Sequence, residues 1–216
     1  MRQHNYWKMQ QLQTKYMQIA LWLLGLVLLA YGLFNWTIEF NCVSTVIGII
    51  CVIISAVMMI FENFLWKVNF VQKIMMTVPI FDKYWTPVLE GRWKGTLQRD
   101  NQDHDFVLEI KQTYTSISCV TYSHHSSSSA ISSDLLYDEQ NNTYQLAFYW
   151  HAYTTRTQPN TGDKNVFNGF TVMNVILEDG HVSKLKGSYF TDRQPKQTHG
   201  TIKLFFEQKS LKQSFE

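Results

Sequence analysis

Two long uncharged, apolar runs near the N-terminus constrain this chain more than any other feature of its sequence. No residue between Lys15 and Glu39 carries a formal charge, and none does between Glu39 and Glu62, which leaves runs of 23 and 22 residues. A helix of about 20 apolar residues crosses the roughly 30 Å hydrocarbon core of a bilayer. Each run therefore predicts a transmembrane helix, and the few residues around 35–41 that join them predict a tight hairpin.

The positions of the basic residues predict the orientation of this hairpin. The loop between the runs holds no Lys or Arg, whereas basic residues flank the hairpin on both sides: Arg2, Lys8, Lys15, Lys67, Lys73 and Lys83. By the positive-inside rule, we expect a two-pass protein whose N-terminus and whole chain after residue 62 lie in the cytoplasm. The alternative is a cleaved signal peptide followed by one anchor. It fits less well, because the first run exceeds the 7–15 residues of a signal h-region.

Two features of the hairpin concern its contacts. Ser44-x-x-x-Gly48 in the second run places small residues four apart, which lets helix backbones approach closely. The sequence leaves open whether this stripe mediates self-association or simply faces lipid. Candidate interfacial anchors are found among the tryptophans near the ends of the runs, which are Trp7, Trp22, Trp36 and Trp66.

After the hairpin the distribution of apolar and polar residues along the sequence changes twice. Residues 62–84 mix apolar and basic residues and predict a helical extension towards Pro79 or Pro87. After Pro87, segments rich in β-branched and aromatic residues alternate apolar and polar positions and are separated by turn residues, which is typical of strands. Eight strands are predicted, at Val88–Gln98, His104–Thr113, Thr115–Tyr122, Ser129–Tyr137, Thr143–Thr154, Val166–Glu178, Val182–Thr191 and Thr198–Gln208.

Short connections between successive strands favour an antiparallel up-and-down barrel. Asp179-Gly180 is a two-residue hairpin signal, because both positions tolerate positive φ. Closure of eight strands removes exposed edges and leaves an interior wide enough for side chains or one small ligand. The predicted fold class is thus two N-terminal transmembrane α-helices plus all-β, with an eight-stranded up-and-down antiparallel β-barrel. The expected domains are the hairpin at 1–62, a juxtamembrane linker at 63–87 and a cytoplasmic barrel at 88–216.

The inward-facing rows of this barrel end in arginine. The apolar row that contains Trp150 continues on the same face to Arg156, and the row of Tyr189 continues through Thr191 to Arg193. Guanidinium groups match phosphate oxygens through paired donors, and aromatic rings stack on bases. An apolar barrel with arginines at its mouth therefore predicts a small, flat, anionic ligand such as a nucleotide. The alternative is that both arginines lie in solvated loops.

Other chemistry finds little support in the sequence. The formal charge of +2, from 19 basic and 17 acidic side chains, argues against binding of a DNA or RNA polymer by bulk charge. Three cysteines give neither a zinc spacing nor a disulfide framework. His124-His125 and the serines after it are interpreted as a solvated stretch, His151 as a packing residue and Cys119 as a small core residue. No nucleophile, base and oxyanion donors come together, so we expect no enzymatic activity, no metal and no cofactor.

The order of parts resembles a known family. A two-span hairpin followed by a cytoplasmic eight-stranded barrel is similar to the two-transmembrane β-barrel effectors of the cyclic-oligonucleotide-based antiphage signalling system (CBASS), the CD-NTase-associated protein 15 type. The motifs that carry this resemblance are Glu90-Gly91-Arg92-Trp93-x-Gly95 and Gly187-x-Tyr189-x-Thr191-x-Arg193…Gly200-x-Ile202-x-Leu204.

The resemblance implies a function. A partner nucleotidyltransferase synthase would make a cyclic dinucleotide on phage infection, and the barrel would capture it. Homo-oligomers of the hairpin would then disrupt the bacterial inner membrane and kill the infected cell, which is abortive infection. By position, the resemblance places Trp93, Tyr189, Thr191 and Arg193 at the ligand, while Arg156 comes from the inward row alone.

Two other classes of function remain open at this point. Gly91-x-Trp93 on the first strand is also similar to lipocalins, so a membrane-anchored carrier of an apolar small molecule is one alternative. A structural or assembly protein with a filled barrel is the other.

Overall fold

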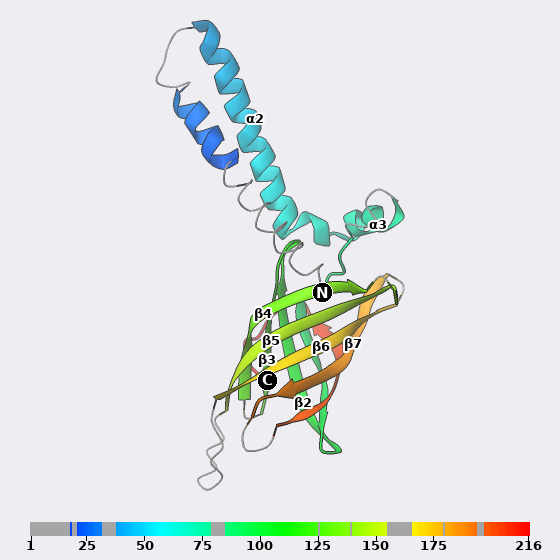
Figure 1. The fold of residues 1–216 in the computed structure, drawn as a ribbon. Coiled ribbons are helices and arrows are strands. Elements are labelled where there is room, and N and C mark those ends of the chain that lie inside the picture. Colours follow the sequence, from blue (N-terminus) through cyan, green and yellow to red (C-terminus); the bar gives the residue numbers. More distant parts are fainter. Residues whose placement is uncertain are drawn as a thin grey trace. The chain divides into compact units, whose positions relative to one another are not determined.

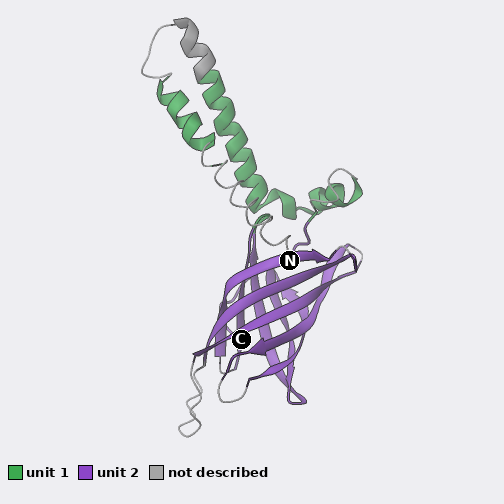
Figure 2. Ribbon diagram, viewed as in Figure 1, with its two compact units in different colours: residues 1–85, 113–115 green, residues 86–112, 116–216 purple. Residues whose placement is uncertain are grey.

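The structure is a computed structural model. It describes residues 18, 21–31, 38–78, 85–124, 126–138, 140–154, 166–178, 180–193 and 197–216. The chain forms two compact units, one of residues 1–85 with 113–115 and one of residues 86–112 with 116–216 (Figure 2).

The second unit is a closed antiparallel barrel in which each strand pairs with its neighbours in sequence and the last strand pairs with the first (Figure 1). This confirms the predicted eight-stranded up-and-down barrel. The strands are β1 (Gly91–Arg99), β2 (Gln102–Gln112), β3 (Ile117–Ser123), β4 (Ser126–Asp138), β5 (Thr143–Thr154), β6 (Val166–Glu178), β7 (His181–Thr191) and β8 (His199–Gln208).

The strand boundaries follow the predicted ones closely. β5 and β6 have the predicted bounds, and most other strands differ at their ends by up to three residues. β4 begins three residues earlier than predicted, at Ser126 rather than Ser129, and pairs with β3 as far as Ser123–Ser126. A register shift between Ala130 and Ser132 follows in the pairing with β5. Serine has no strong strand signal, so sequence pattern alone placed this start too late.

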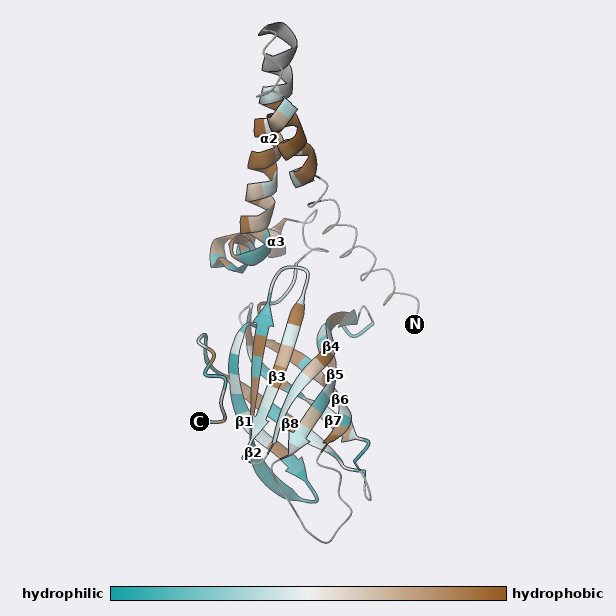
Figure 3. Ribbon diagram, turned by 90° about the vertical axis from the view of Figure 1, so that its left-hand side faces the viewer, coloured by the Kyte–Doolittle hydropathy of each residue, from teal (hydrophilic) through white to brown (hydrophobic). Residues whose placement is uncertain are grey.

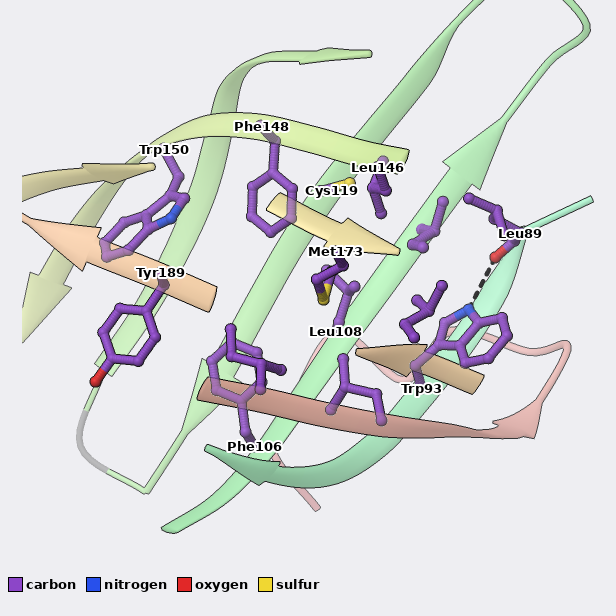
Figure 4. Packing of buried hydrophobic residues seen from close by; sticks show 14 of the residues in the cluster. Leu89, Trp93, Phe106, Leu108, Cys119, Leu146, Phe148, Trp150, Met173 and Tyr189 are labelled. Atoms are coloured by element: carbon purple, nitrogen blue, oxygen red, sulfur yellow. Dashed lines mark hydrogen bonds between the residues drawn. The ribbon is translucent and has the colours of Figure 1, made fainter. Parts of the chain in front are cut away.

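Alternation along the strands creates one apolar core inside the barrel. Figure 3 shows the strands changing between hydrophilic and hydrophobic along their length. Leu108, Leu146, Met173, Leu185 and Leu204 are all fully buried in a single cluster. In Figure 4, Trp150 and Tyr189 lie towards one end of this cluster, while Trp93 and Leu89 lie towards the other.

The end at which the chain enters the barrel is closed by its own side chains. Trp93 is 1% exposed, and its Nε1–H donates to the Leu89 carbonyl at 2.9 Å. The buried Gln112 side chain accepts from the Leu89 N–H and donates to the Pro87 carbonyl. Because the polar groups of the entering segment are paired, it can lie against the core without a desolvation penalty.

One glycine is required by the close approach of β6 and β7. A Cβ on Gly187 would lie 1.9 Å from the Val172 carbonyl oxygen and 2.6 Å from Met173 Cα. Both atoms belong to backbone, so neither can move aside as a flexible side chain would. Glycine in a strand interior commonly marks such a contact.

The first unit contains two apolar helices. A helix at Leu21–Tyr31 is apolar but too short by itself to cross a bilayer, and α2 (Ile38–Asn63) contains a stretch, Thr45–Asn63, that is long and apolar enough to do so. The remainder of the first predicted span lies outside the described residues. Within the described part of the chain, one candidate span and one short apolar helix are therefore found.

These two helices pack against each other through glycines. Gly25 and Gly48 are both buried. A Cβ on Gly25 would lie 3.4 Å from Cys51 Cβ, and one on Gly48 would lie 3.3 Å from the Leu29 backbone nitrogen. The small residue at position 48 therefore allows close packing within the hairpin. Most large side chains of both helices point outwards and are exposed.

The chain after α2 is not one continuous helix, contrary to the predicted extension. A short 3-10 helix, η1 (Leu65–Lys67), is followed by α3 (Asn69–Thr77), and Val68 between them is extended. α3 ends at Thr77, and the next residue, Val78, is also extended, because the residue before Pro79 is disfavoured in helical conformation.

Trp66 in η1 is fully buried, so it does not serve as the interfacial anchor that its position predicts. Its ring contacts Tyr114 edge-on at 5.8 Å, and Glu62 accepts hydrogen bonds from Thr113 and Thr115 in the same unit. The aromatic side chains that remain exposed near the end of α2 are Phe64 and Phe70.

Candidate functional site

A cavity of about 300 Å³ lies inside the barrel at the end opposite to the one that Trp93 closes. Its lining comes from all strands, near the β1–β2, β3–β4, β5–β6 and β7–β8 connections: Leu97, Arg99, His104, Asp105, Phe106, Thr121, Ser123, His124, Ser126, Ser128, Trp150, Ala152, Phe167, Thr171, Tyr189, Thr191, Arg193, Thr198 and Ile202. Strand alternation, which points every second residue inwards, brings these side chains together.

The buried aromatic side chains of Trp150 and Tyr189 line the inner part of the cavity. Trp150 Nε1–H donates to Thr171 Oγ1 at 2.9 Å, and both side chains are buried. Tyr189 is 7% exposed, and burial raises the pKa of its phenol, while the charge of Arg99 lowers it. The phenol therefore stays protonated at neutral pH and can both donate and accept a hydrogen bond.

One wall of the cavity consists of hydroxyl groups. Thr121 and Ser128 hydrogen-bond across β3 and β4 at 2.5 Å, and Ser123 and Ser126 do so at 2.7 Å. The interpretation of the serines after His125 as a solvated stretch is therefore wrong for Ser126 and Ser128. They face inwards because β4 begins at Ser126 and alternates from there.

Two arginines bring positive charge to the cavity. The guanidinium of Arg193 lies over the Phe167 ring, with its Cζ 5.2 Å from the ring centroid. Arg99 reaches the lining from the end of β1, and among the described residues it forms no ion pair with a carboxylate. A guanidinium combines stacking on an aromatic face with a planar fork of N–H donors that matches the oxygens of a phosphate.

The segment that carries Arg193 is fixed by a hydrogen-bond network. Asp192 accepts from the Asn168 backbone N–H at 2.6 Å and from the Asn168 side chain at 3.0 Å. Asn168 Oδ1 also pairs with His151 Nδ1 at 2.8 Å. Thr191 Oγ1 pairs with Thr198 Oγ1 across the start of the β7–β8 connection. His151 thus stabilises the cavity edge from the outer face of β5 and does not line the cavity.

The structure brings together three of the five residues predicted to contact a ligand. Tyr189, Thr191 and Arg193 line the cavity. Trp93 lies at the closed end, fully buried in the core, and does not line the cavity. Arg156 lies outside the described residues.

Sequence reasoning did not single out Arg99 or the hydroxyl wall. Arg99 continues the inward row of Trp93 and Leu97, so the rule that selected Arg193 would also have found it, but the predicted strand Val88–Gln98 ends one residue before it. The hydroxyl wall carries a weaker signal, because a run of serines resembles a solvated loop in composition.

In the described part of the chain, the structure offers no metal-ligating cluster and no exposed thiol at this site. Among the described residues, no group of three or more His, Cys, Asp or Glu side chains could hold a metal ion. Cys119 is 1% exposed in the core, and burial raises the pKa of its thiol far above the usual value. His124 at the cavity edge is 65% exposed and stacks on Phe215, with ring centroids 4.2 Å apart.

Fold and site together define a closed β-barrel with a ligand-sized cavity that presents aromatic rings, hydroxyls and arginines. Residues 84–205 match the family described as "Cap15, cyclic dinucleotide receptor domain", and this match covers more than half of the chain. The chain therefore belongs to the Cap15 family, as the sequence resemblance predicted. No curated protein in the comparison matches this chain. The matched domain is a ligand-binding receptor domain, and the barrel fits a CBASS effector.

Proposed function

We propose that this protein is a membrane-anchored CBASS effector whose barrel binds a cyclic dinucleotide through the cavity at its open end. The observation that carries the proposal is the guanidinium of Arg193 over Phe167, beside Tyr189 and Arg99 in one cavity. An anionic diester would pair with the arginines, and a base would stack on an aromatic ring.

The size of the cavity limits how such a ligand would bind. Its volume of about 300 Å³ is at the lower end of the roughly 300–1,000 Å³ typical of ligand sites. One base would therefore enter between Trp150 and Tyr189, with its phosphate at Arg193 and the second half of the ligand at the mouth. Arg156, from the connection after β5, is proposed as a further phosphate contact there.

The hydroxyl wall favours this ligand over an apolar one. Seven Ser and Thr side chains line the cavity together with two arginines. These hydroxyls pair with one another or with the Trp150 N–H, and each keeps a further lone pair. Base edges and ribose hydroxyls could use these remaining acceptors, whereas an apolar molecule could not. A lipocalin-like carrier is therefore the less favoured function.

The hairpin is proposed to anchor the protein in the membrane and to act on it. We infer that both apolar runs span the bacterial inner membrane, with the N-terminus and the barrel in the cytoplasm. Exposed apolar side chains along α2 support lipid contact. Ligand made by a partner synthase would favour an oligomer, because differential affinity alone shifts such an equilibrium. Assembled hairpins would then disrupt the membrane.

Calorimetric titration of the full chain in lipid nanodiscs with a panel of cyclic dinucleotides tests the ligand assignment. We expect one member to bind with submicromolar affinity, and more weakly at higher salt because exposed charges are screened. Arg193→Ala and Arg156→Ala should each weaken binding roughly 10- to 100-fold, the range for a lost charge-assisted hydrogen bond.

The control is Lys186→Ala, which removes an exposed cation from the outer face of the same strand as Tyr189. It should bind like the wild type. Absence of binding by every panel member would overturn the proposal, and lipid found in the purified barrel by mass spectrometry would then support the carrier function.

A further inference from the structure

An exposed apolar surface follows α2 directly. It is formed by η1, α3 and the residues beside them, and we call it the juxtamembrane surface; its members, with their exposed fractions, are Phe64 (70%), Leu65 (40%), Val68 (48%), Phe70 (71%), Ile74 (37%) and Met76 (37%). We propose that the juxtamembrane surface lies in the headgroup region of an anionic bilayer and holds α3 against it.

The opposite face of α3 is packed, and among the described residues of this unit nothing buries the juxtamembrane surface. Gln72 and Met75 are buried, and Gln72 Nε2–H donates to the Trp66 carbonyl at 2.6 Å. Trp85 Nε1–H donates to Gln72 Oε1 at 2.6 Å. Phe70 and Ile74 are four residues apart, so they share the other face of the helix.

The charges of the segment match an anionic membrane. Lys67 and Lys73 lie within η1 and α3, and no acidic residue occurs between Glu62 and Asp82. Lys67 Nζ lies 5.7 Å from the centroid of the Trp66 ring, so its ammonium group lies beside η1. Basic residues next to a membrane span are attracted to anionic lipid.

The juxtamembrane surface directly follows the candidate membrane span, so lipid is the expected partner of this surface. Thr45–Asn63 ends one residue before Phe64, so the segment must leave the bilayer at that point. Val68 then turns the chain from η1 into α3. A short helix with apolar and basic side chains on its free face is typical of the membrane interface. Phe64 and Phe70 would serve as the anchors that Trp66 does not provide.

The inference rests on the membrane span of the proposed function, but not on ligand binding or oligomerisation. The full chain is reconstituted into vesicles of phosphatidylcholine and phosphatidylglycerol, with the photoreactive p-benzoylphenylalanine in place of Phe70. Phe190, which is 59% exposed on the barrel, is replaced in the same way as a matched control. After illumination we expect lipid adducts at position 70 and none at position 190.

The same assay tests whether the basic side chains of the segment hold it against anionic lipid. Lys67→Gln and Lys73→Gln should each lower the adduct yield at position 70 roughly fivefold. Lys186→Gln on the barrel should leave it unchanged, and vesicles of pure phosphatidylcholine should give a lower yield with the wild-type lysines.

Several results would overturn the inference. Absence of lipid adducts at position 70, in protein that floats with the vesicles, would show that α3 lies in water. A crosslinked dimer in place of the lipid adduct would show that a second copy covers the surface. Failure of the protein to float at all would overturn the membrane span itself, and this inference with it.

Discussion

Arg92 and Glu109 form a 2.8 Å ion pair on the outer wall of the barrel, yet both side chains are buried, with exposed fractions of 1% and 3%. The two residues are directly opposite in the β1–β2 register. The C-terminal segment covers them: Arg92 donates to the carbonyls of residues 214–216, and Glu109 accepts from the N–H groups of residues 212 and 213. The pair therefore fastens this segment along β1 (Figure 3).

Arg92→Ala should release this segment and destabilise the barrel. The substitution removes the ion-pair partner of Glu109 and the donor to the carbonyls of residues 214–216, and breaking a buried ion pair costs about 3–5 kcal/mol of unfolding free energy. Urea unfolding of the full chain in detergent micelles measures the loss, and hydrogen exchange should show faster exchange at residues 212 and 213. Lys94→Ala, at an exposed position of the same strand, should change the free energy of unfolding by less than about 0.5 kcal/mol.

Thr171→Val should destabilise the barrel although the two side chains have nearly the same shape. The substitution removes the acceptor of the buried Trp150 indole N–H, and an unsatisfied buried donor costs about 1–3 kcal/mol. Urea unfolding measures this loss. Thr201→Val is the matched control, since its hydroxyl is exposed. Equal effects of the two substitutions would show that the Trp150 hydrogen bond contributes nothing.

Gly187→Ala should separate β6 from β7 or prevent folding. The added methyl group would overlap the Val172 carbonyl, and overpacking of a tight core costs about 1–3 kcal/mol and sometimes more. Ser188→Ala, at the neighbouring exposed position, should be tolerated. Expression level and near-ultraviolet circular dichroism compare the two variants, and a fully native Gly187→Ala barrel would contradict the close approach of the strands.

Cys119 should be inert in the folded protein. Burial excludes reagent and raises the pKa of the thiol, so little thiolate forms at pH 8. A chain in which Cys42 and Cys51 are replaced by alanine leaves Cys119 as the single thiol. We expect Ellman's reagent to react with it only after addition of denaturant. Rapid reaction in the native state would mean that the core opens at β3.

Gly25→Cys should form a disulfide with the native Cys51 on mild oxidation. The new Cβ would lie 3.4 Å from Cys51 Cβ, close to the roughly 3.5–4.5 Å of disulfides. Mobility on non-reducing gels, with a protease site added between the helices, detects the bond. Leu24→Cys, which is exposed, and Gly25→Cys combined with Cys51→Ala should give none. Disulfides between chains instead of within one would contradict the packing of the two helices in one hairpin.

Much of the barrel was predictable because strand alternation is a local property. Every second residue of β5 and β6 faces the core, so apolar rows mark the strands and their ends. The same rows placed Tyr189, Thr191 and Arg193 on one face, and the cavity contains all three. Trp93 obeys the same alternation, but its height along the barrel axis puts it at the closed end, and alternation carries no information about height.

The sequence by itself determined that the chain has apolar runs of membrane-spanning length followed by eight strands with an apolar interior. Both features depend only on the hydrophobicity of the residues and on their spacing along the chain. Only the tertiary structure decided which polar side chains are buried. Arg92 is as polar in sequence as any surface arginine, and Ser128 resembles a solvated serine, yet Glu109 and Thr121 pair with them across neighbouring strands. Such pairing depends on the register of residues far apart in the chain, and burial of a polar group is tolerated only where that register supplies its partner.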